Sequence, residues 1–453
     1  MEQMQLHVTL ASGQHQSFTV TPNMTVSDLR GLAQKAFGQG LLRLVTPKGR
    51  VLDPTQVLTE AGLVDGDLLT AIAGQVRMAS SASAFALWCS GGDKVITWGN
   101  LMCGGDSSLV QDQLRNVQQV SATFSAFAAI LANGRVVTWG DPSRGGDSSQ
   151  VQEQLCNVKQ VDSSHGAFAA ILGDGRVVTW GNLHYGGDST SVQACLRNVQ
   201  QVKGTGGAFS ALKEDGSVVT WGDTTWGGDS SQVKDQLTNI HALAASNRAF
   251  AAVVRGSGHV ITWGDAAFGG DSSKVKERLV KVKQLEATHH HSGAAFAALL
   301  TGGVVVTWGH SQFGGDNSMV QDQLVNVQQI AATLSAFAAV LADGSVVTWG
   351  DPEFGGDSME VQDRLRNVQG LHATSGAFAA LKHDGTVVTW GDPVLGGDSS
   401  SVAFAFNGTV PVRHIVGTEG AFAAQMADGG LMTWGHLNYG GNSTRVQEQL
   451  RTV

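Results

Sequence analysis

A carboxylate recurs at one position of a repeat in this 453-residue sequence, eight residues after the Trp of a Trp-Gly pair. A ring of such carboxylates could attract cations. An Asp at the start of a short helix or turn, however, commonly accepts hydrogen bonds from nearby backbone N–H groups, and the Asn of the last copy caps equally well. The pattern therefore favours capping. This carboxylate column comprises Asp106, Asp147, Asp188, Asp229, Asp271, Asp316, Asp357, Asp398 and Asn442.

Histidine and cysteine residues supply the other reactive side chains. His289-His290-His291 lies in an insertion between two copies of a repeat. Imidazoles bind metals, but consecutive residues rarely converge on one ion, so a solvated loop is favoured. The cysteines occupy different places in their repeats and form no CxxC pair, which indicates free thiols in a reducing compartment. They are Cys89, Cys103, Cys156 and Cys195.

The sequence contains no motif for catalysis. It has no phosphate-binding loop, no GxSxG, no HExxH, and no cysteine in a nucleophile context with a matching histidine. Turns and caps account for the repeated polar residues. We therefore predict no catalytic residue, no metal site, no cofactor and no enzyme activity.

A variable position five residues after each Trp is the candidate binding site. Large side chains that differ between copies of a loop suit a recognition ring, because aromatic anchors dominate interface energies. The same side chains could instead cap the seams between repeats, and both roles remain open. The two residues before each position vary still more, which favours an exposed loop. The candidates, after Cys103 in the first copy, are Arg144, Tyr185, Trp226, Phe268, Phe313, Phe354, Leu395 and Tyr439.

A unit that occurs nine times must position these residues. The spacings between its Trp-Gly pairs are 41, 41, 41, 42, 45, 41, 41 and 44 residues. In one unit, Phe168–Leu172 is a short apolar strand, Asp174-Gly175 is a strong hairpin signal, and Arg176–Trp180 is the returning strand. The nine Trp residues are Trp98, Trp139, Trp180, Trp221, Trp263, Trp308, Trp349, Trp390 and Trp434.

The rest of the unit predicts a helical turn and a third strand. Ser149 and Gln152 fit a capping box, Val151 and Leu155 share the buried face, and Asn157–Val161 is a further short strand. Such a unit cannot bury both faces alone, so it must stack on its own copies. We predict a mainly β chain in which nine repeats of about 41 residues form a β-propeller, with three short strands and a helical turn per blade. The Trp residues would pack between blades.

The two ends of the repeat region favour a closed ring over an open spiral. The last copy stops at residues 450–453, before the strand that follows in the other copies. Residues 76–80 occupy the phase of that missing strand, ahead of Ala84. Because pairing there would remove free sheet edges, we predict that residues 76–80 and 450–453 seal the ring.

The first 75 residues lack the repeat. Residues 5–10 and 16–20 alternate as a hairpin, a helix follows with Leu29, Leu32, Ala33 and Ala36 on one face, and residues 42–45, 51–52 and 68–71 are further strands. Over LRLVTPKGRVLD and TEAGLVDGDLLTAI the segment resembles ubiquitin, which implies a β-grasp fold. The chain runs on after these strands, so the resemblance implies an integral docking module; a plain spacer is the alternative.

The repeat resembles the regulator-of-chromosome-condensation family. The resemblance is carried by motifs such as ALKHDGTVVTWG at residues 380–391 with Gly396-Gly397 after it, and it covers residues 78–453. It implies a propeller, commonly of seven blades, whose loops can bind proteins; one member is an exchange factor for a small GTPase. The shorter period here is more similar to the compact three-stranded blades of a bacterial β-lactamase-inhibitor propeller.

The composition of the chain indicates its expected location and classes of partner. Charged residues make up 15%, against about 25% typically, and the net charge of −9 argues against broad binding to nucleic acid. No run approaches the ~18 apolar residues of a spanning helix, and the N-terminus does not read as a secretory signal. We expect a monomer in the cytoplasm or nucleus, without membrane contact, divided into residues 1–75 and 76–453.

These observations predict a non-enzymatic scaffold or adaptor. The ubiquitin-like head would dock one protein, such as a component of a ubiquitin-linked pathway, while a loop face of the propeller binds another. The family resemblance leaves two alternatives open: a guanine-nucleotide exchange factor for a small GTPase, and a propeller that inhibits an enzyme through its loops.

Overall fold

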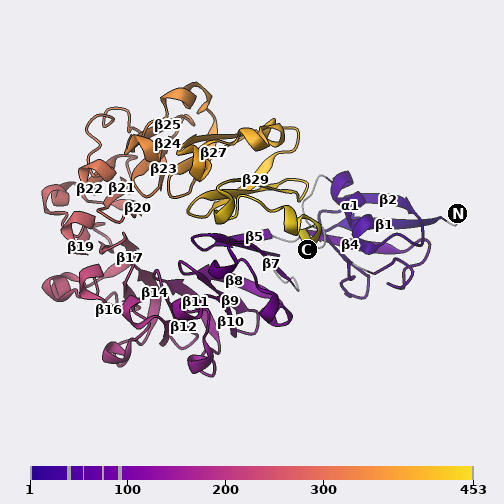
Figure 1. Ribbon diagram of the computed structural model, residues 1–453, viewed down its shortest axis with the longest axis horizontal. Helices are drawn as coiled ribbons and strands as arrows, with labels where there is room; N and C mark the ends of the chain where they lie inside the picture. The colour runs from indigo at the N-terminus through magenta and orange to yellow at the C-terminus, as the bar shows by residue number, and fades with distance from the viewer. Residues whose placement is uncertain (1–2, 38–41, 55, 74–75, 90–93, 451–453) are drawn as a thin grey trace.

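The computed structural model describes residues 3–37, 42–54, 56–73, 76–89 and 94–450. Figure 1 shows two parts, a small head at the N-terminus and a ring of blades, with the head beside the blades that contain β5 and β29. Within the described residues, no helix has the length and apolar character needed to cross a membrane.

The head is a four-stranded sheet packed against one helix. Its strand order is β2-β1-β4-β3, with β1 and β4 parallel and the other pairs antiparallel. The core lies between sheet and helix, around Leu6, Leu29 and Leu69. The elements are β1 (Met4–Leu10), β2 (His15–Val20), α1 (Val26–Phe37), β3 (Leu42–Val45) and β4 (Leu68–Ala73), and an isolated bridge joins Val45 to Val51. This is the predicted β-grasp arrangement.

Helix α1 buries a different stripe from the predicted one. Val26, Leu29 and Ala33 are buried, whereas Leu32 is 40% exposed and Ala36 is also exposed. At 3.6 residues per turn, the buried positions form one stripe, and the two exposed residues lie to one side of it. The helix is therefore correctly located, but its predicted face is partly wrong.

Nine antiparallel sheets of three strands follow the head, and each is one blade. The first strand of each blade lies toward the centre of the ring, as the labelled strands in Figure 1 show. The blades are β5 (Val76–Ser80), β6 (Ala84–Cys89), β7 (Val95–Gly99); β8 (Val117–Ala122), β9 (Ala126–Leu131), β10 (Val136–Gly140); β11 (Val158–Ser163), β12 (Ala167–Leu172), β13 (Val177–Gly181); β14 (Val199–Gly204), β15 (Ala208–Lys213), β16 (Val218–Gly222); β17 (Ile240–Ala245), β18 (Ala249–Val254), β19 (Val260–Gly264); β20 (Val282–Ala287), β21 (Ala295–Leu300), β22 (Val305–Gly309); β23 (Val327–Ala332), β24 (Ala336–Leu341), β25 (Val346–Gly350); β26 (Val368–Ala373), β27 (Ala377–Lys382), β28 (Val387–Gly391); and β29 (Val412–Gly417), β30 (Ala421–Met426), β31 (Leu431–Gly435).

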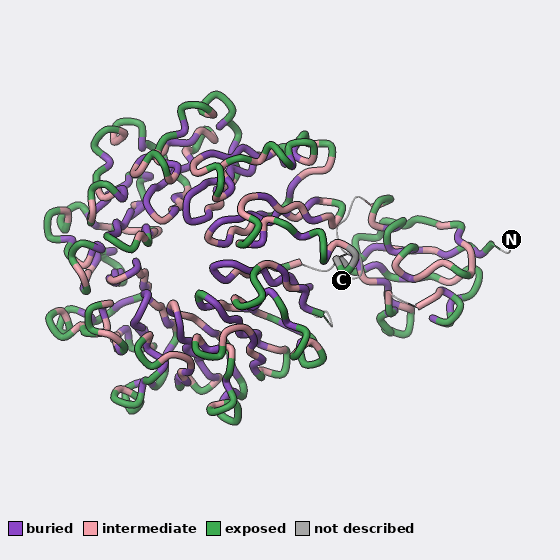
Figure 2. The backbone as a smooth tube through the Cα atoms, in the orientation of Figure 1, coloured by how far each residue is buried: buried purple, intermediate pink, exposed green. Residues whose placement is uncertain are grey.

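The apolar cores lie between blades. Ala126 and Ala128 of blade 2 pack against Phe168 and Ala170 of blade 3 in one cluster of buried residues. The small alanine side chains let neighbouring sheets approach closely, so the Phe rings fill the remaining space. Figure 2 shows burial concentrated along the strands and exposure along the loops at the outside of the ring.

Short helices follow the third strand of each blade. The first set, directly after Trp-Gly, is Leu101–Cys103, Pro142–Arg144, Leu183–Tyr185, Thr224–Trp226, Ala266–Phe268, Ser311–Phe313, Pro352–Phe354, Pro393–Gly397 and Leu437–Tyr439. The second set is Ser108–Gln113, Ser149–Val151, Thr190–Val192, Ser231–Gln236, Ser273–Arg278, Met359–Arg364, Ser400–Phe406 and Thr444–Val446, the last followed by α2 (Gln447–Leu450). Apart from Pro393–Gly397, a π-helix, and α2, all of these are 3-10 helices.

The predicted capping box does not form. The Ser149 N–H donates to Asp147 Oδ1 at 2.9 Å, while the neighbouring Ser148 hydroxyl bonds to Gln152 Oε1 at 2.8 Å. Asp147, two residues before the predicted cap, thus caps this turn, because an Asx turn reaches the N–H two residues on.

Blade 9 packs directly on blade 1. Phe85 and Trp98 of blade 1 share a buried cluster with Ala421 of blade 9 and with Val446. Strand β5 pairs with β6, so the segment after the head supplies the central strand of blade 1. The C-terminal contacts with blade 1 come from residues 437–446, and residues 451–453 lie outside the described part of the chain.

Candidate functional site

Backbone hydrogen bonds link the blades into a hoop at the turns between first and second strands. Each N–H donates to the carbonyl of the next blade, and the Glu419 N–H returns to Ala82 O at 3.0 Å. Among the described residues, the seam between Asn247 and His289 is the exception. We call the nine residues at these turns the mouth residues: Ala82, Phe124, His165, Gly206, Asn247, His289, Leu334, Ser375 and Glu419.

A hydroxyl precedes each mouth residue and holds the loop outside it. The Thr123 hydroxyl donates to Arg144 O at 3.0 Å and accepts from the Ala126 N–H at 3.0 Å. The same donation to the candidate loop position occurs in all nine blades, from Ser81, Thr123, Ser164, Thr205, Ser246, Thr288, Thr333, Thr374 and Thr418. These hydroxyl residues were not predicted from the sequence, although Ser or Thr at this position in every copy was a visible signal.

The nine Trp residues lie in the seams between blades. Each indole is at most 5% exposed and stacks on a Phe of its own blade, as Trp139 does on Phe127 with ring centroids 5.1 Å apart. Trp139 Nε1 also donates to Gly104 O of the preceding repeat at 3.1 Å, and the equivalent bond occurs at every seam. A Cβ on Gly104 would lie 2.5 Å from the Phe127 ring, so this close approach requires glycine.

The candidate loop residues sit over the seams and form a partly buried belt. Phe268 and Phe313 are 4% and 8% exposed, so their rings cannot serve as exposed anchors. The other six, namely Arg144, Tyr185, Trp226, Phe354, Leu395 and Tyr439, are half-buried. The structure thus brings all eight residues to one face of the ring, where they cover the blade junctions.

Two arginines make cation–π contacts with aromatic rings of this belt and beside it. The Arg144 guanidinium lies 5.3 Å from the Phe124 ring centre and 5.6 Å from that of Tyr185. The Arg248 guanidinium lies 4.5 Å from the Trp226 ring centre and 4.9 Å from that of Phe268. Cation–π contacts of this kind are attractive when partly desolvated, so the belt is an ordered surface.

The exposed side chains belong to the two positions before each loop residue, which we call the rim. Four of its large apolar members lie on three consecutive blades, 8, 9 and 1. These are Val394 (60% exposed), Leu437 (68%), Leu101 (63%) and Met102 (77%). A groove of about 430 Å³ runs between Val394 and Leu437.

The mouth residues surround a cavity of about 380 Å³ to which all nine blades contribute. Burial is the main cause that lowers the pKa of His165 to about 4, with Arg144 adding to the effect. The pKa of His289 is likewise lowered to about 4 by surrounding protein and then by His165, although solvent reaches its ring through the cavity. Burial raises the pKa of Glu419 to about 7.

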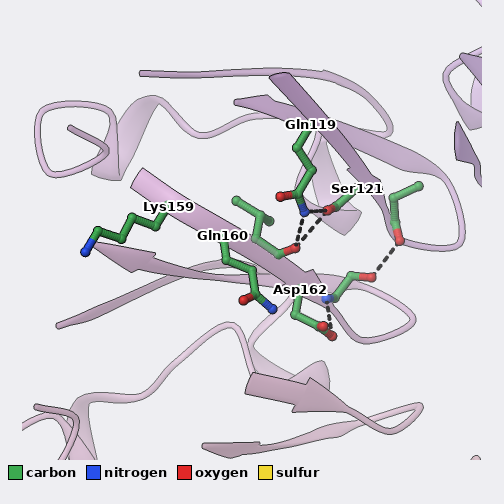
Figure 3. Close-up of a pocket in the computed structure, with 8 residues that line it drawn as sticks. Gln119, Ser121, Lys159, Gln160 and Asp162 are labelled. Atoms are coloured by element: carbon green, nitrogen blue, oxygen red, sulfur yellow. Dashed lines mark hydrogen bonds between the residues drawn. The ribbon is translucent and has the colours of Figure 1, made fainter. Parts of the chain in front are cut away.

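Polar side chains also line the channel wall formed by the first strands. Figure 3 shows one cavity there, where Gln119 and Ser121 of β8 both bond to Val161 O of β11, at 3.3 and 2.7 Å. Asp162 in the same cavity pairs with Lys203 of the next blade at 3.5 Å. Burial raises the Asp162 pKa, and Lys203 opposes that shift. These contacts connect blades and leave little for a ligand.

The Asp, His and Cys residues considered in the sequence lie in turns, loops and strands of the structure. Each Asp of the carboxylate column, and Asn442, accepts a hydrogen bond from the N–H two residues on. Of the three consecutive histidines, His289 lines the mouth, whereas the His290 ring lies 4.1 Å from the His291 ring and 4.3 Å from the Phe313 ring. Within the described residues, no group of His, Cys, Asp or Glu could hold a metal ion, and the cysteines there are free.

The head presents apolar side chains on the open face of its sheet. Leu68 and Ile72 of β4 are 49% and 48% exposed, whereas the alternating Leu69 and Ala71 are buried. Arg43 on the neighbouring strand interacts with Cys89 of blade 1, where burial raises the thiol pKa and Arg43 opposes the rise. Arg30 of α1 also interacts with Cys89, so the head faces the propeller through β3 and α1.

Three comparisons with known proteins were made. No protein-family model and no curated protein matches this chain. Similar solved structures include Prp20p from Saccharomyces cerevisiae, described with its binding properties to Gsp1p and histones (15% identity, 75% of this chain and 90% of that one, TM-score 0.39). The ACR4 receptor-kinase ectodomain of Arabidopsis thaliana matches at 15% identity over 61% and 95%, TM-score 0.36. Ubiquitin from Caldiarchaeum subterraneum matches at 29% over 17% and 98%, TM-score 0.16. The chain is similar in fold to RCC1-type propellers and to ubiquitin-like domains.

Proposed function

We propose that this chain is a non-enzymatic, protein-binding adaptor of the cytoplasm or nucleus. The observation that carries the proposal is the set of exposed apolar rim residues on the consecutive blades 8, 9 and 1. Val394, Leu437, Leu101 and Met102 are all at least 60% exposed on one face, and exposed apolar groups that gather on one surface commonly mark a protein interface.

The contrast between constant residues in the repeat and variable residues on its surface supports the same proposal. The residues that join blades are nearly constant in type: Trp, Gly, Asp and a hydroxyl. The rim and the mouth residues differ from blade to blade. A rigid frame with a varied surface is suited to recognising an asymmetric partner, because few side chains need ordering on binding.

The head supplies a second surface in this proposal. Leu68 and Ile72 on its open face would bind a component of a ubiquitin-linked pathway, while the rim binds a different protein. Figure 1 shows the head beside blades 1 and 9, so both surfaces belong to the same sector of the molecule.

Affinity capture from cells with rim variants tests the adaptor function. Changing Leu101, Met102, Val394 and Leu437 to Ser should reduce recovery of propeller partners at least tenfold, since each buried apolar side chain contributes about 1.5–3 kcal/mol. The matched control changes Met319 and Met359, which are 92% and 82% exposed elsewhere on the ring, to Ser. Equal recovery with rim and control variants would contradict the proposal.

A nucleotide-release assay separates the adaptor from the exchange-factor alternative. Purified chain is added to small GTPases loaded with fluorescent GDP. The adaptor proposal expects release at the spontaneous rate. Accelerated release that the rim variant abolishes would instead assign exchange activity to this face, and inhibition of a co-captured enzyme would favour the inhibitor alternative.

A further inference from the structure

Glu419 is the only carboxylate among the nine mouth residues. Its side chain is half-buried at the cavity, and within the described residues no hydrogen bond or ion pair to its carboxylate is found. Burial alone raises its pKa to about 7. A carboxylate in such a place lacks the compensating charge that buried acids usually have.

Ala82 and Phe124 follow Glu419 in the hoop, and all three residues line the cavity. The Glu419 N–H bonds to Ala82 O at 3.0 Å, and the Ala82 N–H bonds to Phe124 O at 3.1 Å. Glu419 and Phe124 therefore lie on either side of Ala82, which is itself buried. Phe124 is 38% exposed, so an aliphatic stem can lie against its ring with its charged end at Glu419.

The surrounding charges favour a cation at this place. His165 and His289 remain neutral near pH 7 because the surrounding protein lowers the pKa of each to about 4. Arg144, over the outer side of this region, lies 3.9 Å from Asp141. Deeper in the channel, Lys203 is paired with Asp162, and the pKa values of His372 and His414 are lowered by burial. The chain as a whole carries a net charge of −9.

We propose that the mouth binds one basic side chain, an Arg or Lys that projects from a partner protein, with its charge on Glu419 and its stem against Phe124. The hoop holds the mouth at a fixed width, so the site is preorganised for one extended side chain. This inference rests on the proposed protein-binding function and names the chemistry by which the partner is recognised.

Ligand-observed NMR titrations with two short peptides test the site. The probes are an acetylated, amidated Gly-Gly-Arg-Gly-Gly and its citrulline counterpart, which has the same shape without the charge. Wild-type protein should bind the Arg peptide at least tenfold more tightly, since a charge-assisted hydrogen bond is about twice as strong as a neutral one. In Glu419→Gln this preference should disappear.

Controls separate charge at the mouth from charge in general. Glu353→Gln removes an exposed carboxylate on the same face and should retain the tenfold preference, while Phe124→Ser should weaken both peptides. Thermal unfolding of each variant establishes that it is folded. Equal binding of the two peptides to wild type, or an unchanged preference in Glu419→Gln, would overturn the site.

The peptide result is independent of the adaptor assay. If the Arg peptide fails to bind while rim variants still lose partners, the mouth site is wrong and the adaptor function stands. If butylguanidinium binds with the Glu419 dependence but the Arg peptide does not, the site takes a free small cation, and the assignment to a partner's side chain is refuted.

Discussion

Replacing Trp98 by Phe should destabilise the propeller as much as the same change at Trp221. Trp98 lies in the seam that closes the ring, with its Nε1 3.2 Å from Gly440 O, whereas Trp221 lies in an internal seam, 3.0 Å from Gly186 O. The two indoles are 4% and 3% exposed. In a closed ring the two seams contribute equally to stability, so the two substitutions should have equal effects.

The magnitude follows from the contacts that are lost. Phe retains the stacking on Phe85 or Phe209, at centroid distances of 5.0 and 5.2 Å, but leaves a glycine carbonyl buried without its donor. That loss costs about 1–3 kcal/mol, and the missing part of the indole removes about 1 kcal/mol of apolar burial. We expect a decrease of about 2–4 kcal/mol in the free energy of unfolding.

Differential scanning calorimetry measures this effect. With an unfolding entropy of about 2.1 cal/mol/K per residue over roughly 375 residues, the expected decrease in Tm is about 3–5 °C for both variants. A decrease for Trp221→Phe with an unchanged Tm for Trp98→Phe would show that the closing seam contributes no stability. The equivalence of the nine seams would then be refuted.

Three further predictions use calorimetry at defined pH. Gly145→Ala should destabilise the folded protein by about 2–4 kcal/mol, because the added Cβ would lie 2.6 Å from the Phe168 ring. Gly256→Ala is also at positive φ but has open space around it, so it should destabilise by only about 1 kcal/mol; equal destabilisation by the two variants would refute the steric argument. The pKa of Glu419 is about 7 in the folded state, against 4.5 ordinarily, so the folded state holds a proton that the unfolded state loses, and the free energy of unfolding falls as pH rises from 4.5 to 7. Glu419→Gln should therefore raise the free energy of unfolding by about 1–2 kcal/mol at pH 8 and leave it unchanged at pH 4; an increase at both pH values would contradict this reasoning. Asp147→Ala should lose about 0.5–1.5 kcal/mol at its turn while Asp147→Asn loses almost nothing, and a similar loss for Asn would mean that charge, and not capping, is decisive.

The blades and their seams were predictable because one unit repeats nine times. Hairpin signals such as Asp174-Gly175 locate the strand pairs, and a unit that cannot bury its own faces has to stack. In such a stack, the Trp residues are expected to pack in the seams between blades. In the head, element positions followed from alternation, but the helix phase was missed because Leu32 and Ala33 are equally apolar in sequence.

The roles of the loop residues could not be read from a single repeat. Whether Phe268 is an exposed anchor or a seam cover depends on its contacts with residues outside its own loop, such as the Arg248 guanidinium 4.9 Å from its ring centre. The mouth residues were missed for a similar reason. Each lies in an ordinary turn, and only the ring brings Glu419 next to Ala82, far away in the sequence.

The Trp98–Gly440 contact joins residues 342 positions apart, and this separation matters while the chain is being made. Blade 1 leaves the ribosome with one apolar flank uncovered. At roughly 5–20 residues per second, that flank waits about 20–70 s for the ninth repeat to arrive. Translation speed and chaperone supply should therefore influence the yield of folded protein more strongly than for a domain built from neighbouring segments.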